Sequence, residues 1–308
     1  MAGVIRRLAF AGAANAAARA VLREAAASPR DAAASPRGAL PPGAWLRANY
    51  RGREVDLRGG LALGSGLIVS ALGLTRRGKH RAGAEANLAR SLGAAGAIGV
   101  ATVAGLVDDM AQDTVHRGLA GHLGELKRGR VTTGLAKLVT ITTGAAVFAG
   151  LNQFAARSPG PDAGWPRTST AGALWRAGVD TVLVAGAANL ANLLDLRPGR
   201  ALKAALVPGA LLAAGGGPGA DLAAGTVGAI TAVAPGDLDE RTMLGDSGAN
   251  ALGAAIGIAA VRSLRPGGRC LAAALVSGLI LASEKISFSK VIATHPLLAR
   301  LDALGRLE

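Results

Sequence analysis

Four acidic positions stand where apolar runs of the sequence end or begin: Asp108–Asp109, Asp195, Asp237–Asp239 and Asp246. A buried Asp costs about 2.5–3.5 kcal/mol at the centre of a membrane-spanning helix, and less toward the ends. Carboxylates are therefore rare at such places unless they have a function. Counting the apolar runs assigns all four positions to the same membrane face, which predicts one shared site for a metal ion and phosphate.

The first of these positions is the carboxylate pair that ends the segment AGLVDD, residues Ala104–Asp109. Neighbouring residues on a helix do not face the same way. One carboxylate of the pair can therefore ligate a cation while the other meets a proton or a basic side chain. A solvated helix end without chemistry is the alternative interpretation.

A second group of polar residues stands at the end of a later apolar run. Asn189, Asn192 and Asp195 follow one another at three-residue steps, which places them close to one face of a helix. Two amides and a carboxylate at a helix end suit hydrogen bonding to a polar ligand near the membrane surface.

Three basic residues follow directly, namely Arg197, Arg200 and Lys203. Guanidinium groups match the geometry of phosphate oxygens. A helix that opens after Pro198 points its first amide groups at an anion. The alternative is ordinary anchoring by the positive charge of a cytoplasmic membrane face.

The segment GDSGANALG, residues Gly245–Gly253, predicts a tight turn and then a helix of small residues with Asp246 at its N-terminus. An N-cap without chemistry is the alternative for Asp246. Arg58-Gly59-Gly60 opens another apolar run in a similar way. The residues before the turn are expected to form a solvated loop: Asp237, Asp239, Glu240 and Arg241.

The composition predicts an all-α integral membrane protein. Of the 308 residues, 50% are hydrophobic, the mean hydropathy is +0.36, and the charges cluster between apolar runs. The 45 glycines favour closely packed helices. A single cysteine, Cys270, allows no intrachain disulfide.

The charge balance bears on the partners. The formal net charge is +14 and only 3% of the residues are aromatic, and the chain has no nucleic-acid recognition motif, so we expect no nucleic-acid partner. In so apolar a chain, Lys and Arg are expected to set the topology and to meet anionic lipid or phosphorylated substrates.

The apolar runs predict a polytopic bundle of about 8–10 transmembrane helices. Residues 1–45 are expected to hold a first helix over Val4–Val21 and an Ala/Pro/Arg-rich linker, and residues 46–308 the membrane domain. A first span, an interfacial helix and a signal-like segment are the alternatives for Val4–Val21. Several runs are shorter than the ~20 residues of a standard span, so tilt or flanking residues must complete them. The eight runs are Gly60–Leu74, Ser91–Val107, Leu138–Ala156, Ala171–Leu194, Ala201–Ala214, Leu222–Ala234, Ser247–Val261 and Leu271–Ala282.

Alternation of these runs predicts which segments share a face. If Arg47–Arg58 lies on one face, then Asp108–Lys137, Asp195–Lys203, Pro235–Asp246 and Glu284–Glu308 return to it. This face carries most of the Lys and Arg residues, so the positive-inside rule makes it cytoplasmic. Thr75–Arg90, on the other face, is a basic exception.

In this order, these motifs resemble the polyprenyl-phosphate N-acetylhexosamine-1-phosphate transferase superfamily (glycosyltransferase family 4), which includes phospho-MurNAc-pentapeptide translocase and UDP-GlcNAc:undecaprenyl-phosphate transferases. The resemblance extends from about Asn49 to Val261. It rests on four motifs: Arg58-Gly59-Gly60, Gly105–Asp109, N-x-x-N-L-x-D at Asn189–Asp195, and Gly245–Gly248 with Leu252-Gly253.

The resemblance implies a multi-pass enzyme of the cell membrane whose active site is cytoplasmic. A polyprenyl phosphate would attack the β-phosphate of a UDP-sugar and release UMP, with Mg²⁺ as cofactor, in cell-envelope glycan biosynthesis. It implies Asp246 and Asp109 as metal ligands, and a homodimer is compatible with it. The catalytic set would be Asp108, Asp109 and Asp195, and the substrate-binding set Asn189, Asn192, Arg197, Arg200, Lys203 and Lys137.

The chain departs from the family pattern in three places. Pro198 stands where the family has a second Asp, a long insertion containing Arg117 and His122 follows the Asp pair, and the His-rich loop is reduced to His295. These departures leave a second hypothesis, a non-catalytic relative that binds lipid-linked intermediates or scaffolds envelope assembly. A secondary transporter is disfavoured, because its carboxylates would be expected near the bilayer midplane.

Overall fold

The computed structural model describes residues 2–27, 42–73, 81–111, 124–129, 131–157 and 169–307. The linker at 28–41, residues 75–80 of the predicted basic loop, and the insertion with Arg117 and His122 lie outside the described residues, whereas the rest of that predicted loop, from Arg81 to Arg90, belongs to helix α3. The described elements are α1 (Ala2–Ala27), a 3₁₀ turn (Pro42–Trp45), β1 (Leu46–Ala48), β2 (Glu54–Asp56), α2 (Arg58–Gly73), α3 (Arg81–Ala111), α5 (Thr133–Arg157), α6 (Thr170–Leu194), α7 (Arg200–Ala214), α8 (Ala220–Leu238), α9 (Gly245–Ser263), α10 (Pro266–Ser283), α11 (Phe288–Thr294) and α12 (Pro296–Ala303).

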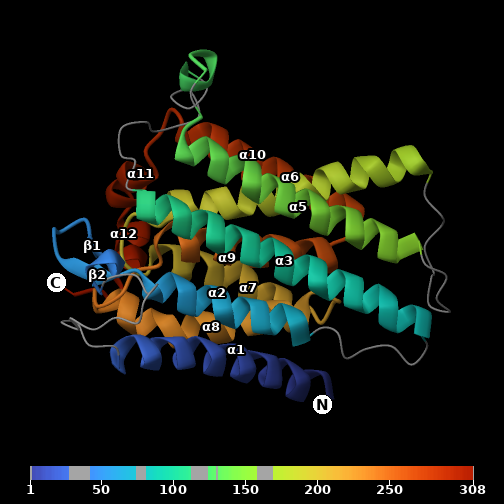
Figure 1. Cartoon of the computed structure of the whole chain (residues 1–308), viewed down its shortest axis with the longest axis horizontal. Coiled ribbons are helices and arrows are strands. Elements are labelled where there is room, and N and C mark those ends of the chain that lie inside the picture. Colours follow the sequence, from blue (N-terminus) through green and yellow to red (C-terminus); the bar gives the residue numbers. More distant parts are fainter. Residues whose placement is uncertain are drawn as a thin grey trace.

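The long helices run side by side along the long axis of the molecule, as Figure 1 shows. Helix α1 lies along α2 and α8 at one edge, and α5, α6 and α10 form the opposite edge. The antiparallel hairpin of β1 and β2 lies with α11 and α12 at one end of the bundle. The structure therefore confirms the predicted all-α bundle, with the hairpin as a minor addition.

Helix α9 lies at the centre of this bundle, packed against α2, α3, α6, α7 and α8. Most of its residues are buried, and the majority of those are Gly, Ala or Ser. Small residues let helix backbones approach closely, which is how helices without a large hydrophobic driving force pack in a membrane. At Gly105 of α3 an added Cβ would overlap the backbone of Asp246 and Ser247, so only glycine permits this crossing.

Four of the described helices are long and apolar enough to cross a membrane. They are Ala84–Ala111, Thr133–Ala156, Thr170–Leu194 and Pro266–Ser283, and the apolar helix α2 is shorter. The central helices α8 and α9 have 19 residues each, which gives a length of about 28 Å at 1.5 Å per residue. The structure supports an association with the membrane, and the expected number of about 8–10 transmembrane helices stays a prediction.

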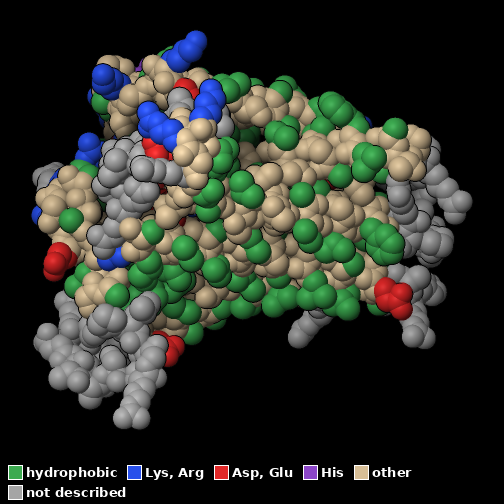
Figure 2. All heavy atoms as spheres, turned by 45° about the horizontal axis from the view of Figure 1, so that its top comes forward, with side chains coloured by type: hydrophobic (Ala, Val, Ile, Leu, Met, Phe, Trp, Pro, Cys, Tyr) green, Lys and Arg blue, Asp and Glu red, His purple; other side chains and the backbone are tan. Residues whose placement is uncertain are grey.

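The surface has a charge distribution that suits an association with the membrane. On the face seen in Figure 2, the long flank of the bundle is covered by hydrophobic side chains and backbone, whereas Lys and Arg gather at one end. That end holds the hairpin, α11 and α12 in Figure 1.

The N-terminal helix is part of the bundle. Ala14 and Ala18 of α1 are fully buried, and the amide of Asn15 donates a hydrogen bond to the Gly228 carbonyl of α8 at 3.1 Å. Near its start, Arg6 pairs with Asp221 at 2.8 Å. The helix that the sequence places in residues 1–45 therefore packs against the membrane domain along its length.

The tight crossing of α3 and α9 leads to a first prediction. Gly105→Ala should lower the free energy of unfolding by about 1–3 kcal/mol, the usual cost of overpacking, because its methyl group meets the α9 backbone. Gly96→Ala on the same helix is the matched control, since nothing lies within 4 Å of a Cβ there. Denaturation of the detergent-solubilised variants would measure both. Equal stabilities would contradict the close packing.

Candidate functional site

The ends of three helices meet around one ammonium group. Lys137 in the second turn of α5 donates to Oδ2 of Asp108, near the end of α3, at 2.6 Å. The same Nζ donates to Oδ2 of Asp246, in the first turn of α9. All three side chains keep some exposure, between 15% and 28%. The structure thus brings together three of the residues that the sequence selects. Asp109, beside Asp108, binds Ser247, which lies 138 residues further along the chain.

Asp109 holds the start of α9 in place. Its Oδ1 accepts a hydrogen bond from the backbone N–H of Asp246 at 2.9 Å, and its Oδ2 accepts one from Ser247 at 3.0 Å. Helix α9 has no side-chain cap of its own, because Leu244 occupies the N-cap. A carboxylate from α3 therefore satisfies the free amides and the positive end of the helix dipole.

The turn before α9 depends on glycine. Gly245 has a φ of +58°, a region where side chains cause strain, and a Cβ there would also stand 2.8 Å from Oδ2 of Asp109. Gly60 of α2 approaches the Leu244 carbonyl so closely that any Cβ would overlap it. The Arg-Gly-Gly motif therefore seats α2 against this turn, while its Arg58 pairs with Asp56 at 2.5 Å.

Asp195 directly follows α6 and lies within electrostatic range of the same centre. Burial raises the pKa of this carboxyl well above its usual range, and the negative charges of Asp237, Asp246 and Asp109 raise it further. Asn189 and Asn192 are half-buried on α6. Within the part of the chain that the structure describes, their side-chain amides form no hydrogen bond, so they keep donors and acceptors for a ligand.

The prediction of a solvated loop before α9 is wrong for two of its residues. Asp237 is 4% exposed and Glu240 is 6% exposed. Oδ2 of Asp237 accepts from the N–H of Gly199 at 2.5 Å, which fixes the turn that opens α7. Asn49 donates to Glu240 at 2.7 Å. Sequence reasoning missed these roles, because both carboxylates accept from segments far away in the chain.

Two of the predicted phosphate-binding residues contact the C-terminal helices in the structure. Arg200 forms a bidentate salt bridge with the Asp302 carboxylate, at 2.8 and 2.9 Å. Lys203 donates to the backbone carbonyl of Asp302 at 2.6 Å. Burial favours the neutral acid at Asp302, but Arg200 and Arg306 outweigh it and hold its pKa below the usual range. Arg197 instead lies over the ring of Tyr50, with Cζ 4.0 Å from the centroid.

The donor set at the centre suits Mg²⁺ better than a metal that needs a protein cage. Among the described residues no group of three or more His, Cys, Asp or Glu side chains could hold a metal ion. Mg²⁺, however, often uses one or two carboxylates and fills its other positions with water and substrate phosphate. Asp108 and Asp246, which converge on one point, fit that pattern. Asp109, with both oxygens bonded to the α9 backbone, is the poorer candidate.

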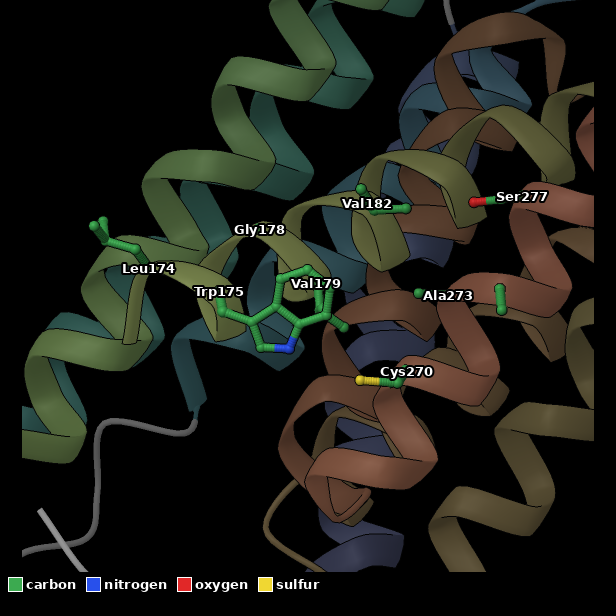
Figure 3. A pocket seen from close by; sticks show the side chains of 9 residues that line it. Leu174, Trp175, Gly178, Val179, Val182, Cys270, Ala273 and Ser277 are labelled. Atoms are coloured by element: carbon green, nitrogen blue, oxygen red, sulfur yellow. The ribbon is translucent and has the colours of Figure 1, made fainter. Parts of the chain in front are cut away.

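A separate hollow of about 560 Å³ lies between α6 and α10. Figure 3 shows Trp175 on one helix and Cys270 and Ala273 on the other around this space. Its lining is almost entirely apolar and includes no charged side chain. Both helices are candidate spans, and the lining of this hollow includes no residue of the carboxylate centre.

Comparisons with protein-family models, with curated proteins and with solved structures found no match to this chain.

The capping geometry yields a second prediction. Asp109→Ala should lower the free energy of unfolding by about 2 kcal/mol, because two amides of the α9 N-terminus lose a charged acceptor. Asp109→Asn should cost less, since its amide oxygen can still accept one of the two hydrogen bonds. Chemical denaturation in detergent would rank the three proteins. An Ala variant as stable as the parent would show that Asp109 does not hold α9.

Proposed function

We propose that the protein transfers a sugar-1-phosphate from a UDP-sugar to a polyprenyl phosphate and releases UMP, with Mg²⁺ as cofactor. The observation that carries this proposal is the convergence of Asp108, Lys137 and Asp246 at the junction of three helices. The centre combines carboxylates for a divalent cation with a cation for phosphate oxygens. It adjoins long apolar helices, which suits an acceptor that is dissolved in lipid.

The proposed reaction is a displacement at phosphorus. An oxygen of the lipid phosphate forms a bond to the β-phosphorus of the UDP-sugar. The bond between that phosphorus and the bridging oxygen breaks, and UMP leaves with its electron pair. When bound by Asp108 and Asp246, Mg²⁺ would neutralise negative charge on the phosphates.

The remaining residues would position the substrates and neutralise the negative charge of their phosphates. Lys137 offers its ammonium group to the phosphate oxygens, and Asp109 keeps Asp246 in place by holding the first turn of α9. Asn189 and Asn192 offer unpaired amides to the nucleotide or sugar. In-line positioning and electrostatic stabilisation are the main contributions that phosphoryl transfer requires from a protein.

The proposed active site lies at the cytoplasmic membrane face. The carboxylate centre and the Tyr50–Arg197 contact belong to helix ends and loops that the sequence assigns to one face, and Lys and Arg gather at this end in Figure 2. An excess of positive charge marks the cytoplasmic side of membrane proteins.

A second candidate function is the binding of lipid-linked intermediates without catalysis, by a non-catalytic relative of the transferases. It is favoured by the ion pairs of Lys137, which already neutralise Asp108 and Asp246 without a metal ion. The Arg197-Pro198 segment, which replaces an acidic residue of the family pattern, points in the same direction. Release of UMP from any UDP-sugar by the purified protein would exclude this function.

A screen of UDP-sugars with a polyprenyl phosphate and Mg²⁺ tests the proposal through UMP release. Asp246→Asn and Asp108→Asn should each reduce the rate about 100-fold or more, the usual range for loss of an electrostatic catalytic group. Asp239→Asn is the matched control, because this half-exposed carboxylate pairs only with Arg241 in the described structure. Undiminished transfer by the Asp246 variant would contradict the assigned role.

Lys137→Met allows a test that does not depend on activity. Removing the ammonium group leaves two neighbouring carboxylates uncompensated, so Mg²⁺ should take its place. We expect Mg²⁺ to raise the melting temperature of this variant more than that of the parent, as binding to the folded state requires. No rise in the melting temperature of either protein with Mg²⁺ would argue against a cation site between Asp108 and Asp246.

A further inference from the structure

A second polar cavity lies at the same end of the bundle. It measures about 770 Å³ and is lined by the β1–β2 turn, the segment before α7, and the C-terminal helices. Four arginines face it against one carboxylate, that of Asp302; they are Arg51, Arg197, Arg200 and Arg306. The excess of positive charge is typical of a site for an anion.

One of these arginines is free to bind a ligand. Arg200 and Arg306 are both engaged by Asp302, and Arg51 donates to the Tyr50 hydroxyl at 2.7 Å. Within the described residues Arg197 forms neither a hydrogen bond nor an ion pair. Its guanidinium carbon Cζ lies 4.0 Å from the centroid of the Tyr50 ring, which is a cation–π contact. That contact fixes the group and leaves its five N–H donors available.

The helix beside the cavity presents an apolar face outward. Leu297 and Leu301 of α12, and Leu304 directly after it, are between 52% and 67% exposed. The opposite side of this helix carries Asp302, which binds Arg200. Helices α11 and α12 follow the candidate span α10 after a short connection and lie at its end in Figure 1. Such a two-sided helix next to a span is suited to lie in the membrane interface.

We propose that this cavity binds the phosphate headgroup of an anionic phospholipid, with Arg197 as the phosphate-contacting residue and the α12 leucines in contact with the acyl region. The arginines of the cavity and the exposed leucines of α12 support the same occupant, because a free phosphate would bind the arginines but would not contact the leucines. The site is separate from the carboxylate centre and does not rest on the proposed transferase function.

Titration of the detergent-solubilised full-length protein with fluorescent phosphatidylglycerol tests the proposal. Arg197→Gln should weaken binding about fivefold, the value of one basic residue near an anionic lipid surface. Arg241→Gln is the matched control, because it removes an exposed arginine at the same end but outside the cavity. It should change the affinity less than twofold. Equal affinities of the parent and the Arg197 variant would overturn the proposal.

Two further arms test the source of the phosphate. Leu301→Gln alters an exposed side chain and should leave thermal stability unchanged while weakening the lipid affinity. Inorganic phosphate and fluorescent phosphatidylcholine serve as the comparison ligands, and neither should match phosphatidylglycerol. Displacement of the labelled lipid by an equal concentration of inorganic phosphate would show a site for free anions, which contradicts the proposal, as would an unchanged affinity of the Leu301 variant.

Discussion

The ion pairs of Lys137 are the interaction on which the candidate site depends. Asp108 and Asp246 come from helices α3 and α9 and meet at one point, where two carboxylates without a cation would repel each other. A charge in a partly buried environment is tolerated only when it is paired. The ammonium group from α5 supplies that pairing for both acids.

Packing and chemistry are connected through α9. This helix occupies the centre of the bundle because its small residues allow five neighbours to approach its backbone. Its first turn carries Asp246, and Asp109 secures that turn from α3. A change at the α3–α9 crossing therefore acts on the carboxylate centre as well as on stability. The motif around Gly105 and the Asp pair combines both roles within five residues.

Much of this arrangement could be predicted from the sequence, and the limits have physical reasons. Apolar runs that end in acidic residues indicated the helices and the shared end, because the period of hydrophobic residues and the cost of buried charge are local properties. The different roles of Asp108 and Asp109 could not be predicted from the sequence. Which carboxylate caps α9 depends on the angle at which two helices cross, and no local pattern encodes that angle.

The same limit explains the interpretations that the structure changed. Asp237 and Glu240 look like a loop in sequence, yet they are buried because Gly199 and Asn49 reach them from distant segments. Arg200 and Lys203 follow a helix end in a pattern typical of phosphate binding, but α12 returns to that place and engages both. Long-range returns of the chain decide these contacts, and a single sequence does not show them.

The central claim is that Lys137 and Asp246 interact directly, and a double-mutant cycle measures this. The free energies of unfolding of Lys137→Met, Asp246→Asn and the double variant would be compared with that of the parent protein. The account predicts a coupling energy of about 1–3 kcal/mol, since residues in one salt-bridge network are not additive. Additive effects within about 0.5 kcal/mol would show that the two side chains act independently, and the account would then be wrong.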